Sequence, residues 1–224
     1  MKLWLATTSP EIAADAFSLG LFEGVLTNPT LIADAGRPVG PLLADLCAAT
    51  PGPVFFQLRD GPREALQRQA DRLLGLGLDN LGIKVALTQE GCAVLHWLRE
   101  QKVALRLATA VPSVAALLLA TALEVPWVTP SSSALERQGG PSRLALLEDM
   151  QTALDRQHAD TVLIPSFSAP ADLAAGGLLG LRAGFIWDRD LERFVSLPLI
   201  REIVAGFDPA WERIPSFDEN GDGA

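Results

Sequence analysis

Short apolar runs alternate with longer amphipathic stretches along the whole chain. Apolar runs of about four to eight residues are typical of buried strands, and apolar positions repeated every three to four residues are typical of helices. The pattern predicts strands at Lys2–Ala6, Gly24–Asn28, Val54–Leu58, Leu81–Leu87, Ala104–Val111, Val125–Pro130, Thr161–Ser166 and Gly184–Trp187. The stretches that follow them predict helices at Pro10–Leu19, Pro41–Ala49, Pro62–Leu76, Gln89–Glu100, Val114–Leu123, Leu144–Gln157, Ala171–Leu179 and Asp190–Ala205.

The order of these elements predicts an α/β fold in which eight parallel strands, each followed by a helix, close into a (β/α)8 TIM barrel. The predicted strands are apolar on both faces, as in a parallel sheet covered by helices. The alternative is a doubly wound open sheet, which favours a glycine-rich turn after the first strand, whereas residues 6–10 contain no glycine. We expect one barrel domain with a C-terminal helical extension over residues 1–215, and a disordered acidic tail over residues 216–224.

The composition is that of a folded protein, with 49% hydrophobic and 20% charged residues among 224. A formal net charge of −9 argues against a nucleic-acid partner, because phosphate backbones repel an acidic surface. The first residues lack the apolar run of a signal peptide, and no stretch has the roughly 20 apolar residues of a membrane span. We expect a cytoplasmic protein with no membrane partner.

The chain has few residues that bind metal ions. Its two cysteines, Cys47 and Cys92, lie far apart in predicted helices, where buried free thiols are the ordinary interpretation. Residues 218–223 match the start of a calcium loop, but the glutamate that closes such a loop is missing. We expect no metal ion and no cofactor.

One lysine stands in an apolar strand of a chain that has three lysines and no tyrosine. Side chains alternate along a strand, so Lys84 shares its face with Gly82 and Ala86, which are small and leave room beside it. If this face points into the barrel, burial lowers the pKa of the ammonium group. A neutral amine forms Schiff bases with ketones and aldehydes. The alternatives are a lysine that reaches water at the strand end and one that is paired with a carboxylate.

Chemistry in such a barrel takes place at the carboxyl ends of the strands. Polar residues that the sequence places there are candidates for the site: Thr27, Asn28, Gln57, Thr109, Thr129, Ser131, Ser166 and Ser168.

Several segments together resemble the transaldolase family over nearly the whole chain. Thr27-Asn28-Pro29-Thr30 is similar to its TNP signature, and residues 83–91, IKVALTQEG, are similar to the strand that carries its Schiff-base lysine. The resemblance continues through residues 108–111, 138–140 and 166–167. The short length and Gln57 place the chain nearer the small fructose-6-phosphate aldolase-like branch than the larger classical transaldolases.

The resemblance implies a class I (Schiff-base) aldolase or transaldolase-like enzyme that cleaves or forms a carbon–carbon bond in a small ketose or sugar phosphate. Lys84 is then the nucleophile, Asn28 holds the carbinolamine hydroxyl, and Gln57 and Thr109 position a catalytic water. Ser166 contacts the far end of the substrate. The other implied substrate-binding residues are Thr27, Thr129, Ser131 and Ser168. The resemblance also implies a homo-oligomer, a pentamer or decamer assembled through the C-terminal helix.

The chain departs from the family pattern at residues that handle protons. Ala6 stands where the first strand usually ends in an aspartate, Leu26 replaces a threonine, and Ser131 replaces a tyrosine. A positioned acid or base contributes roughly 10²–10⁴-fold in rate, so these losses are serious. Asp188, after the last strand, is either a replacement acid or base or the cap of the last helix, and the cap is the preferred interpretation. The second hypothesis for the whole chain is a non-catalytic barrel kept for ligand binding or assembly.

Two further departures concern phosphate. The family has an arginine after the sixth strand and a basic residue after its Ser-Phe pair, whereas this chain has Ala134 and Ser168. Arg137 is near the first position in sequence, but we expect it on the surface. Phosphate is bound best by charge-assisted donors, so the sequence predicts weak affinity for sugar phosphates and a preference for a neutral or smaller carbonyl compound.

Two apolar features are compatible with assembly. The stretch Val114–Leu123 is almost wholly apolar, which indicates a helix buried at an interface. Trp211 lies on a polar C-terminal arm, which packs either on its own barrel or on a neighbouring subunit.

Overall fold

The structure, a computed structural model, describes residues 1–131, 136–137 and 141–214. The strands are β1 (Lys2–Ala6), β2 (Phe22–Leu26), β3 (Val54–Gln57), β4 (Leu81–Ala86), β5 (Arg106–Val111), β6 (Trp127–Pro130), β7 (Val162–Leu163), β8 (Ser166–Phe167) and β9 (Ala183–Trp187). The helices are α1 (Pro10–Ser18), α2 (Pro29–Asp34), α3 (Val39–Ala49), α4 (Arg63–Leu74), α5 (Gln89–Glu100), α6 (Val114–Ala122), α8 (Arg143–Arg156), α9 (Pro170–Leu178), the 3-10 turn η1 (Asp188–Asp190), α10 (Leu191–Val195), α11 (Pro198–Ala205) and α12 (Asp208–Trp211).

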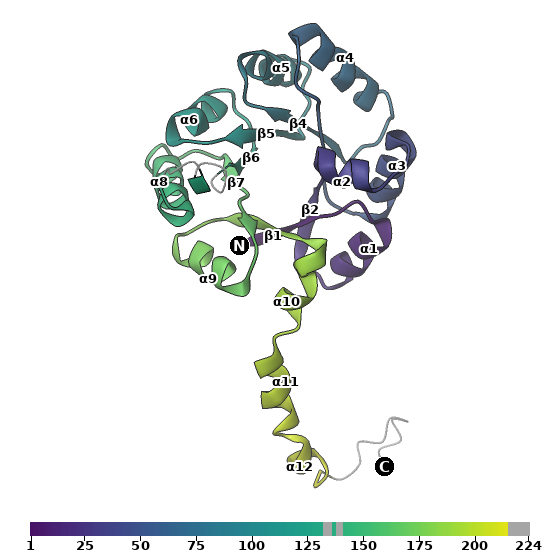
Figure 1. The fold of residues 1–224 in the computed structure, drawn as a ribbon, viewed down its shortest axis with the longest axis vertical. Helices are drawn as coiled ribbons and strands as arrows, with labels where there is room; N and C mark the ends of the chain where they lie inside the picture. Colours follow the sequence, from purple (N-terminus) through teal and green to yellow (C-terminus); the bar gives the residue numbers. More distant parts are fainter. Residues whose placement is uncertain (132–135, 138–140, 215–224) are drawn as a thin grey trace, which may run out of the picture.

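The strands form one parallel sheet in the order β7-β6-β5-β4-β3-β2-β1-β9-β8. Its two edge strands are close neighbours in the chain, because only Ile164 and Pro165 lie between them. Ile164 donates its N–H to Val128 of β6 at 2.8 Å, and Phe185 of β9 donates its N–H to Pro165 at 2.8 Å. The sheet therefore curls into a ring with helices outside it (Figure 1), and this arrangement fits a TIM-like barrel.

Alternating side chains divide the apolar interior into two cores. The larger core combines strand residues such as Leu5 and Ile83 with residues of the helices, so it lies between the sheet and its helical cover. None of the buried residues of the smaller core comes from a helix, so this core fills the inside of the ring. There the ring centroid of Trp4 lies 5.7 Å from that of Phe55 and 6.0 Å from that of Trp127. A packed aromatic layer thus occupies the barrel interior.

Two predicted elements are interrupted at prolines. The prediction of one helix over Asp190–Ala205 is wrong, because the chain forms η1, α10 and α11 there. Leu197, which precedes Pro198, is extended with φ −72° and ψ 119°, as residues before proline prefer to be. The predicted strand Thr161–Ser166 is divided into β7 and β8 at Pro165, which has no N–H to donate to a neighbouring strand.

The segment after the second strand also differs from the prediction. The strand predicted at Gly24–Asn28 begins at Phe22 and ends at Leu26. A short helix that the pattern did not predict, α2, follows at once. Asn28 is its N-cap, because its Oδ1 accepts a hydrogen bond from the N–H of Leu31 at 2.9 Å. The polar residues thus form a strand-to-helix turn.

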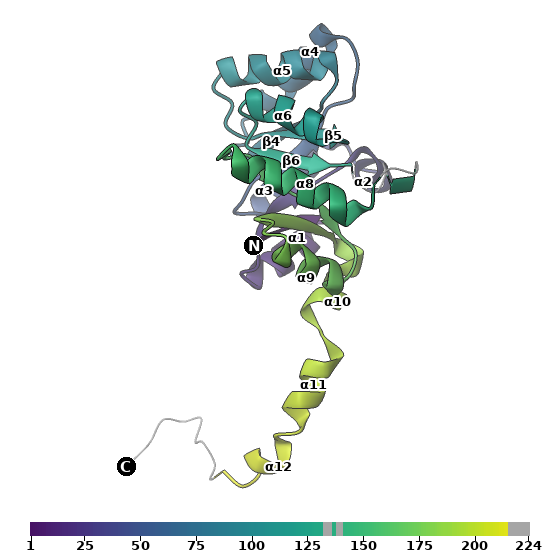
Figure 2. The same cartoon turned by 90° about the vertical axis from the view of Figure 1, so that its left-hand side faces the viewer.

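Helices α11 and α12 lie away from the ring in both views (Figures 1 and 2). Their large apolar side chains are exposed, Leu199 to 64% and Trp211 to 66%. Trp211 therefore does not pack on its own barrel. A helix as short as α11 has marginal stability by itself. Its apolar face has no cover within the described chain.

The apolar helix predicted over Val114–Leu123 corresponds to α6. Leu117 and Ala120 are buried against the barrel, whereas Leu119 is 58% exposed. Within the part of the chain that the structure describes, no helix has the length and apolar character needed to traverse a lipid bilayer.

Candidate active site

The carboxyl ends of the strands bring the predicted site residues together. Gln57 is the last residue of β3 and pairs in register with Lys84 of β4. Thr109 lies on the next strand, β5, followed by Thr129 on β6 and Ser166 on β8. Because the strands are parallel, these ends meet at one rim of the barrel. The rim therefore carries neutral polar side chains, and Lys84 lies just inside it, two residues before the end of β4.

Lys84 is buried in the barrel, with 7% of its surface exposed. Its Nζ donates a hydrogen bond to the carbonyl oxygen of Thr27 at 3.3 Å, and it forms no ion pair with any described residue. Burial removes water from the ammonium group and lowers the pKa of Lys84 from its ordinary 10.5 to about 8. At pH 7 roughly a tenth of the molecules then carry a neutral amine. The lysine is neither solvated nor paired with a carboxylate.

The open space near Lys84 is not where the sequence placed it. Gly82 shares the face of Lys84, but a Cβ atom at Gly82 would collide with the ring of Phe55. Phe55 is wholly buried and fills this position. Ala86, nearer the rim, is half-buried. The side of Lys84 that is open to a ligand therefore faces the rim.

Thr27 and Asn28 connect β2 to α2 beside the lysine. The hydroxyl of Thr27 is buried and donates to the carbonyl of Phe55 at 2.8 Å, so it is already bonded within the protein. The carbonyl of Thr27 accepts the bond from Lys84. The Oδ1 atom of Asn28 caps α2, whereas its Nδ2 group has no hydrogen-bond partner among the described residues. That amide donor is free to meet a ligand.

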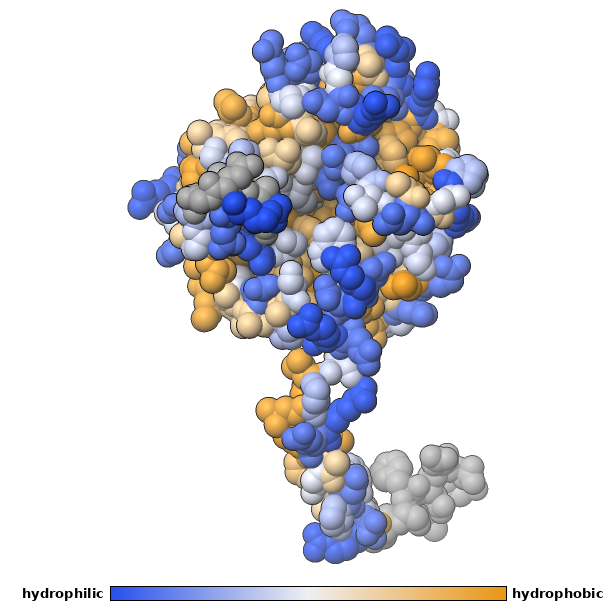
Figure 3. All heavy atoms as spheres, viewed as in Figure 1, coloured by the Kyte–Doolittle hydropathy of each residue, from blue (hydrophilic) through white to orange (hydrophobic). Residues whose placement is uncertain are grey.

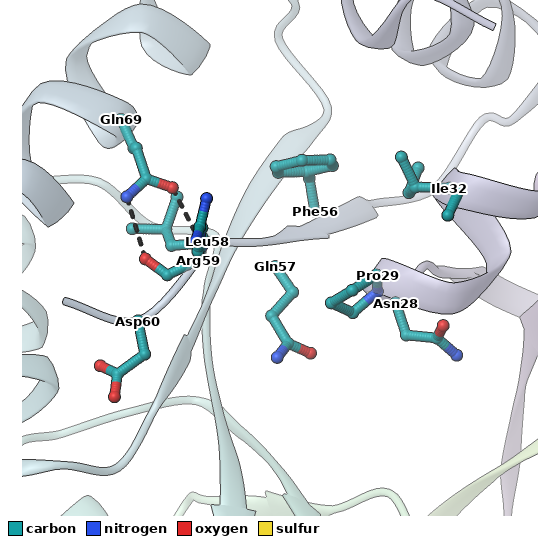
Figure 4. A pocket seen from close by; sticks show the side chains of 10 residues that line it. Asn28, Pro29, Ile32, Phe56, Gln57, Leu58, Arg59, Asp60 and Gln69 are labelled. Atoms are coloured by element: carbon teal, nitrogen blue, oxygen red, sulfur yellow. Dashed lines mark hydrogen bonds between the residues drawn. The ribbon is translucent and has the colours of Figure 1, made fainter. Parts of the chain in front are cut away.

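A pocket of about 510 Å³ opens beside β3 (Figure 4). It is lined by Asn28, Pro29, Ile32, Ala33, Phe56, Gln57, Leu58, Arg59, Asp60 and Gln69. The side chains of Asn28 and Gln57 point to one side of the chain, whereas those of Phe56 and Ile32 point to the other. Lys84 does not line this pocket, but its register partner Gln57 does, and so does Asn28, which follows its hydrogen-bond partner Thr27. The pocket thus adjoins the polar groups that flank the lysine.

The loop at the floor of this pocket is held in place by one side chain. The amide of Gln69 on α4 accepts from the N–H of Arg59 and donates to the carbonyl of Arg59, each at 2.9 Å. This pair of bonds imitates a strand pairing and fixes the backbone directly after Gln57.

Thr109 and Thr129 form a hydroxyl pair on adjacent strands. Thr129 is buried and its Oγ1 donates to Oγ1 of Thr109 at 2.8 Å. A hydroxyl that accepts one bond keeps its own proton for another. Thr109 therefore presents a donor to a water molecule or ligand.

The three serines differ in position. Ser131 is half-buried and adjoins residues 132–135, which lie outside the described part of the chain. Ser166 is half-buried on β8. Ser168 is exposed, and its N–H donates to Oδ2 of Asp172 at 2.7 Å at the start of α9. The Gln138-Gly139-Gly140 motif and Ala134 also lie outside the described residues, and Arg137 is exposed.

The rim carries no carboxylate where the family pattern has one. Ala6 is 2% exposed at the end of β1 and pairs in register with Leu26 and Trp187. Leu26 is equally buried. These side chains make the floor of the site apolar between β9 and β2.

The carboxylate of Asp188 accepts two hydrogen bonds that give it a structural role. Its Oδ2 accepts from the hydroxyl of Thr7 at 2.7 Å, and its Oδ1 accepts from the N–H of Arg189 at 2.7 Å. Thr7 is wholly buried and follows the inward-facing Ala6, so alternation directs Thr7 to the outer side of the wall. The carboxylate thus fastens the end of β9 to the end of β1.

The sequence pattern did not identify two residues at this rim as part of the site. Trp187 lies on the same face of β9 as Phe185, and their ring centroids are 5.6 Å apart. The Cζ atom of Arg189 lies 4.6 Å from the ring centroid of Trp187. Period-two alternation from Ala183, which belongs to the inner core, could have identified Trp187 as inward-facing. Nothing in the sequence indicated that Arg189 folds back over it.

The described residues contain no group of three or more His, Cys, Asp or Glu side chains placed to hold a metal ion. Cys47 is buried and Cys92 is half-buried, and both are free thiols. Burial raises the pKa of Cys47 to about 11, which makes this thiol a poor nucleophile.

Comparison with known proteins finds relatives that align over nearly the whole chain. No protein-family model matches it. A protein of Aquifex aeolicus named probable transaldolase is 27% identical over 216 residues, which are 96% of this chain and 98% of the relative. One of Maridesulfovibrio salexigens with the same name is 27% identical over 96% of this chain and 99% of the relative. These similarities support a relation to the transaldolase family.

A more similar but shorter match is found in a probable transaldolase of Caulobacter sp. strain K31, which is 36% identical over 41% of this chain and 42% of the relative. Among solved structures, a mutant flavocytochrome b2 with pyruvate bound aligns with a TM-score of 0.58 at 11% identity. The alignment covers 92% of this chain but only 64% of that chain. This likeness concerns the fold alone.

Proposed function

We propose that the protein is a class I aldolase or transaldolase-like enzyme that forms a Schiff base through Lys84. The observation that carries the proposal is a buried amine with a pKa of about 8, no ion pair among the described residues, and neutral polar side chains around it. Similarity to proteins named probable transaldolase over nearly the whole chain supports it.

In the proposed reaction the lone pair of the Lys84 nitrogen attacks the carbonyl carbon of a ketose and forms a carbinolamine. Loss of water gives an iminium ion. A base then removes the proton of the hydroxyl group on the β-carbon, and the bond between the α- and β-carbons breaks. Its electron pair forms the C=C bond of an enamine, the π pair of the iminium moves to nitrogen, and the β-carbon leaves as an aldehyde. The enamine that is left is protonated and hydrolysed, or it attacks a second aldehyde in the reverse sense.

The neighbouring side chains take roles that their free hydrogen-bonding groups allow. Nδ2 of Asn28, which follows β2 two strands away from β4, donates to the carbinolamine oxygen. The amide of Gln57 and the hydroxyl of Thr109 hold the water that carries protons to and from the intermediate. Because Ala6 provides no carboxylate, this water and the lysine perform the proton transfers, and we expect turnover slower by roughly 10²-fold or more than with a positioned acid.

The substrate proposed is a small ketose or sugar phosphate, following the names of the relatives. The short length and Gln57 support the small fructose-6-phosphate aldolase-like branch. We also propose one barrel domain over residues 1–215 with a C-terminal helical extension, a cytoplasmic location, and a homo-oligomer. The exposed apolar residues of α11 and α12 support assembly, because Leu199 and Trp211 have no cover in the described chain.

Reductive trapping tests the proposal. The protein is incubated with dihydroxyacetone and sodium borohydride, and the modified peptide is identified by mass spectrometry. We expect covalent addition at Lys84, none in Lys84→Met, and unchanged addition in the control Lys102→Met, which replaces an exposed lysine. Equal modification of wild type and Lys84→Met would remove the Schiff-base mechanism.

The second candidate function is a catalytically impaired barrel that binds ligands or serves in assembly. Ala6 favours it, because its buried methyl group, which is 2% exposed, cannot transfer a proton. Turnover of an aldol donor at ordinary enzyme rates would exclude this candidate, whereas trapping at Lys84 without turnover would support it.

A further inference from the structure

A cation stands at the mouth of the barrel without a carboxylate partner. The guanidinium of Arg189 forms no ion pair with any described residue. The acidic neighbours of Arg189 are engaged elsewhere. The carboxylate of Asp188 accepts from the hydroxyl of Thr7 and from the backbone N–H of Arg189. Oδ1 of Asp190 lies 3.5 Å from Nη1 of Arg193. The charge of Arg189 is therefore available to an anion.

The position of this cation is set by an inward-facing aromatic ring. Ala183 and Phe185 of β9 face the inner core, so Trp187 on the same strand face also points into the barrel. It is the last residue of β9, at the rim. Arg189 lies over its ring at 4.6 Å. An arginine stacked on an aromatic face is held flat, with its N–H donors directed outward from the edge of the plane.

The order of the strands places this cation opposite the lysine. β9 is the fourth strand from β4 around the ring, after β3, β2 and β1. In an eight-stranded barrel four steps lead to the far side, about 15 Å away between Cα atoms. Lys84 and Trp187 both face the inside of the ring, so a ligand that meets both of them spans this space.

The surface agrees with this placement. Figure 3 shows hydrophilic side chains gathered beside the centre of the ring, above the start of α10. Ser166 pairs in register with Phe185, so its hydroxyl lies on the strand next to the one that carries Trp187. On this side of the rim, the polar end of a ligand meets both the hydroxyl of Ser166 and the guanidinium of Arg189.

We propose that Arg189, stacked on Trp187, binds the phosphate group of a substrate whose carbonyl end reacts with Lys84. Phosphate is favoured over a neutral end because a guanidinium offers two parallel donors to a pair of its oxygens. The proposal rests on the proposed function for the location of the carbonyl, and it makes Arg189 a specificity-determining residue. It replaces the expectation of weak phosphate binding, which was based on Ala134 and Ser168 alone.

Two measurements test the proposal separately from the Schiff-base chemistry. The first is borohydride trapping at Lys84 as a function of the concentration of fructose or fructose 6-phosphate. In Arg189→Met we expect the half-maximal concentration to rise at least tenfold for the phosphate ester and less than twofold for fructose. Arg189→Lys should recover part of the difference, because it keeps the charge without the paired donors. Arg68→Met is the control, since Arg68 is an exposed arginine on α4.

The second measurement is calorimetric binding of sorbitol 6-phosphate, which has no carbonyl group and needs no reaction at Lys84. We expect binding by wild type and by Lys84→Met, and at least tenfold weaker binding by Arg189→Met. Equal affinity of wild type and Arg189→Met would overturn the assignment of Arg189. Absence of trapping together with loss of sorbitol 6-phosphate binding in Arg189→Met would refute the proposed function and uphold the phosphate site.

Discussion

Replacing Lys84 by methionine should stabilise the fold at neutral pH. The folded-state pKa of about 8 lies below the ordinary 10.5, so the buried ammonium opposes folding wherever both states are protonated. A difference of this size corresponds to about 3 kcal/mol, since one pKa unit is about 1.4 kcal/mol. Methionine has a similar length and no charge, which suits the buried site.

The loss of the 3.3 Å bond from Lys84 to the carbonyl of Thr27 subtracts about 1 kcal/mol at every pH. Lys84→Met should therefore be about 2 kcal/mol more stable than wild type at pH 7. The ammonium penalty disappears as pH rises from the folded pKa to the unfolded one. By pH 9.5 the advantage should have fallen by about 2 kcal/mol.

Urea unfolding followed by tryptophan fluorescence at pH 7 and pH 9.5 measures this difference. Lys102→Met, in an exposed turn, is the control for loss of a positive charge as such. An unfolding free energy of Lys84→Met that differs from wild type by the same amount at both pH values would refute the argument that burial perturbs this amine.

Three further outcomes are expected. Gly184→Ala should lower the unfolding free energy by about 1–3 kcal/mol in urea, because its Cβ would collide with the buried ring of Phe167; a stability equal to wild type would contradict the packing. Thr129→Val removes the donor to Thr109 and should lower kcat several-fold with about 1 kcal/mol of destabilisation; unchanged turnover would exclude the pair from catalysis. Asp188→Asn should lower stability and leave the pH dependence of kcat unchanged, and a shifted pH profile would instead make Asp188 an acid or base.

The fold was predictable because strand and helix periods reach along the whole chain. Errors arose where one residue overrides a periodic pattern. Pro198 divides the last predicted helix, and Pro165 divides a strand at the point where the ring closes. Both effects come from the missing N–H and the restricted residue before proline. Neither changes the order of elements, so the architecture was still expected correctly.

The position of Lys84 followed from alternation along β4, but its surroundings did not. The small Gly82 predicted empty space beside Lys84, whereas the ring of Phe55 on the neighbouring strand occupies that space. Contacts of this kind depend on register between strands, which the sequence does not specify. The same reason hid Arg189, whose place over Trp187 depends on the turn after β9.

The proposed chemistry depends on an amine that titrates far below an ordinary lysine. The chain has three lysines, so NMR of protein carrying isotope-labelled lysine gives few signals, and the one missing in Lys84→Met is assigned directly. We predict that this signal titrates with a midpoint near pH 8. A midpoint near the ordinary 10.5 would contradict the buried, nucleophilic lysine on which the proposed chemistry is based.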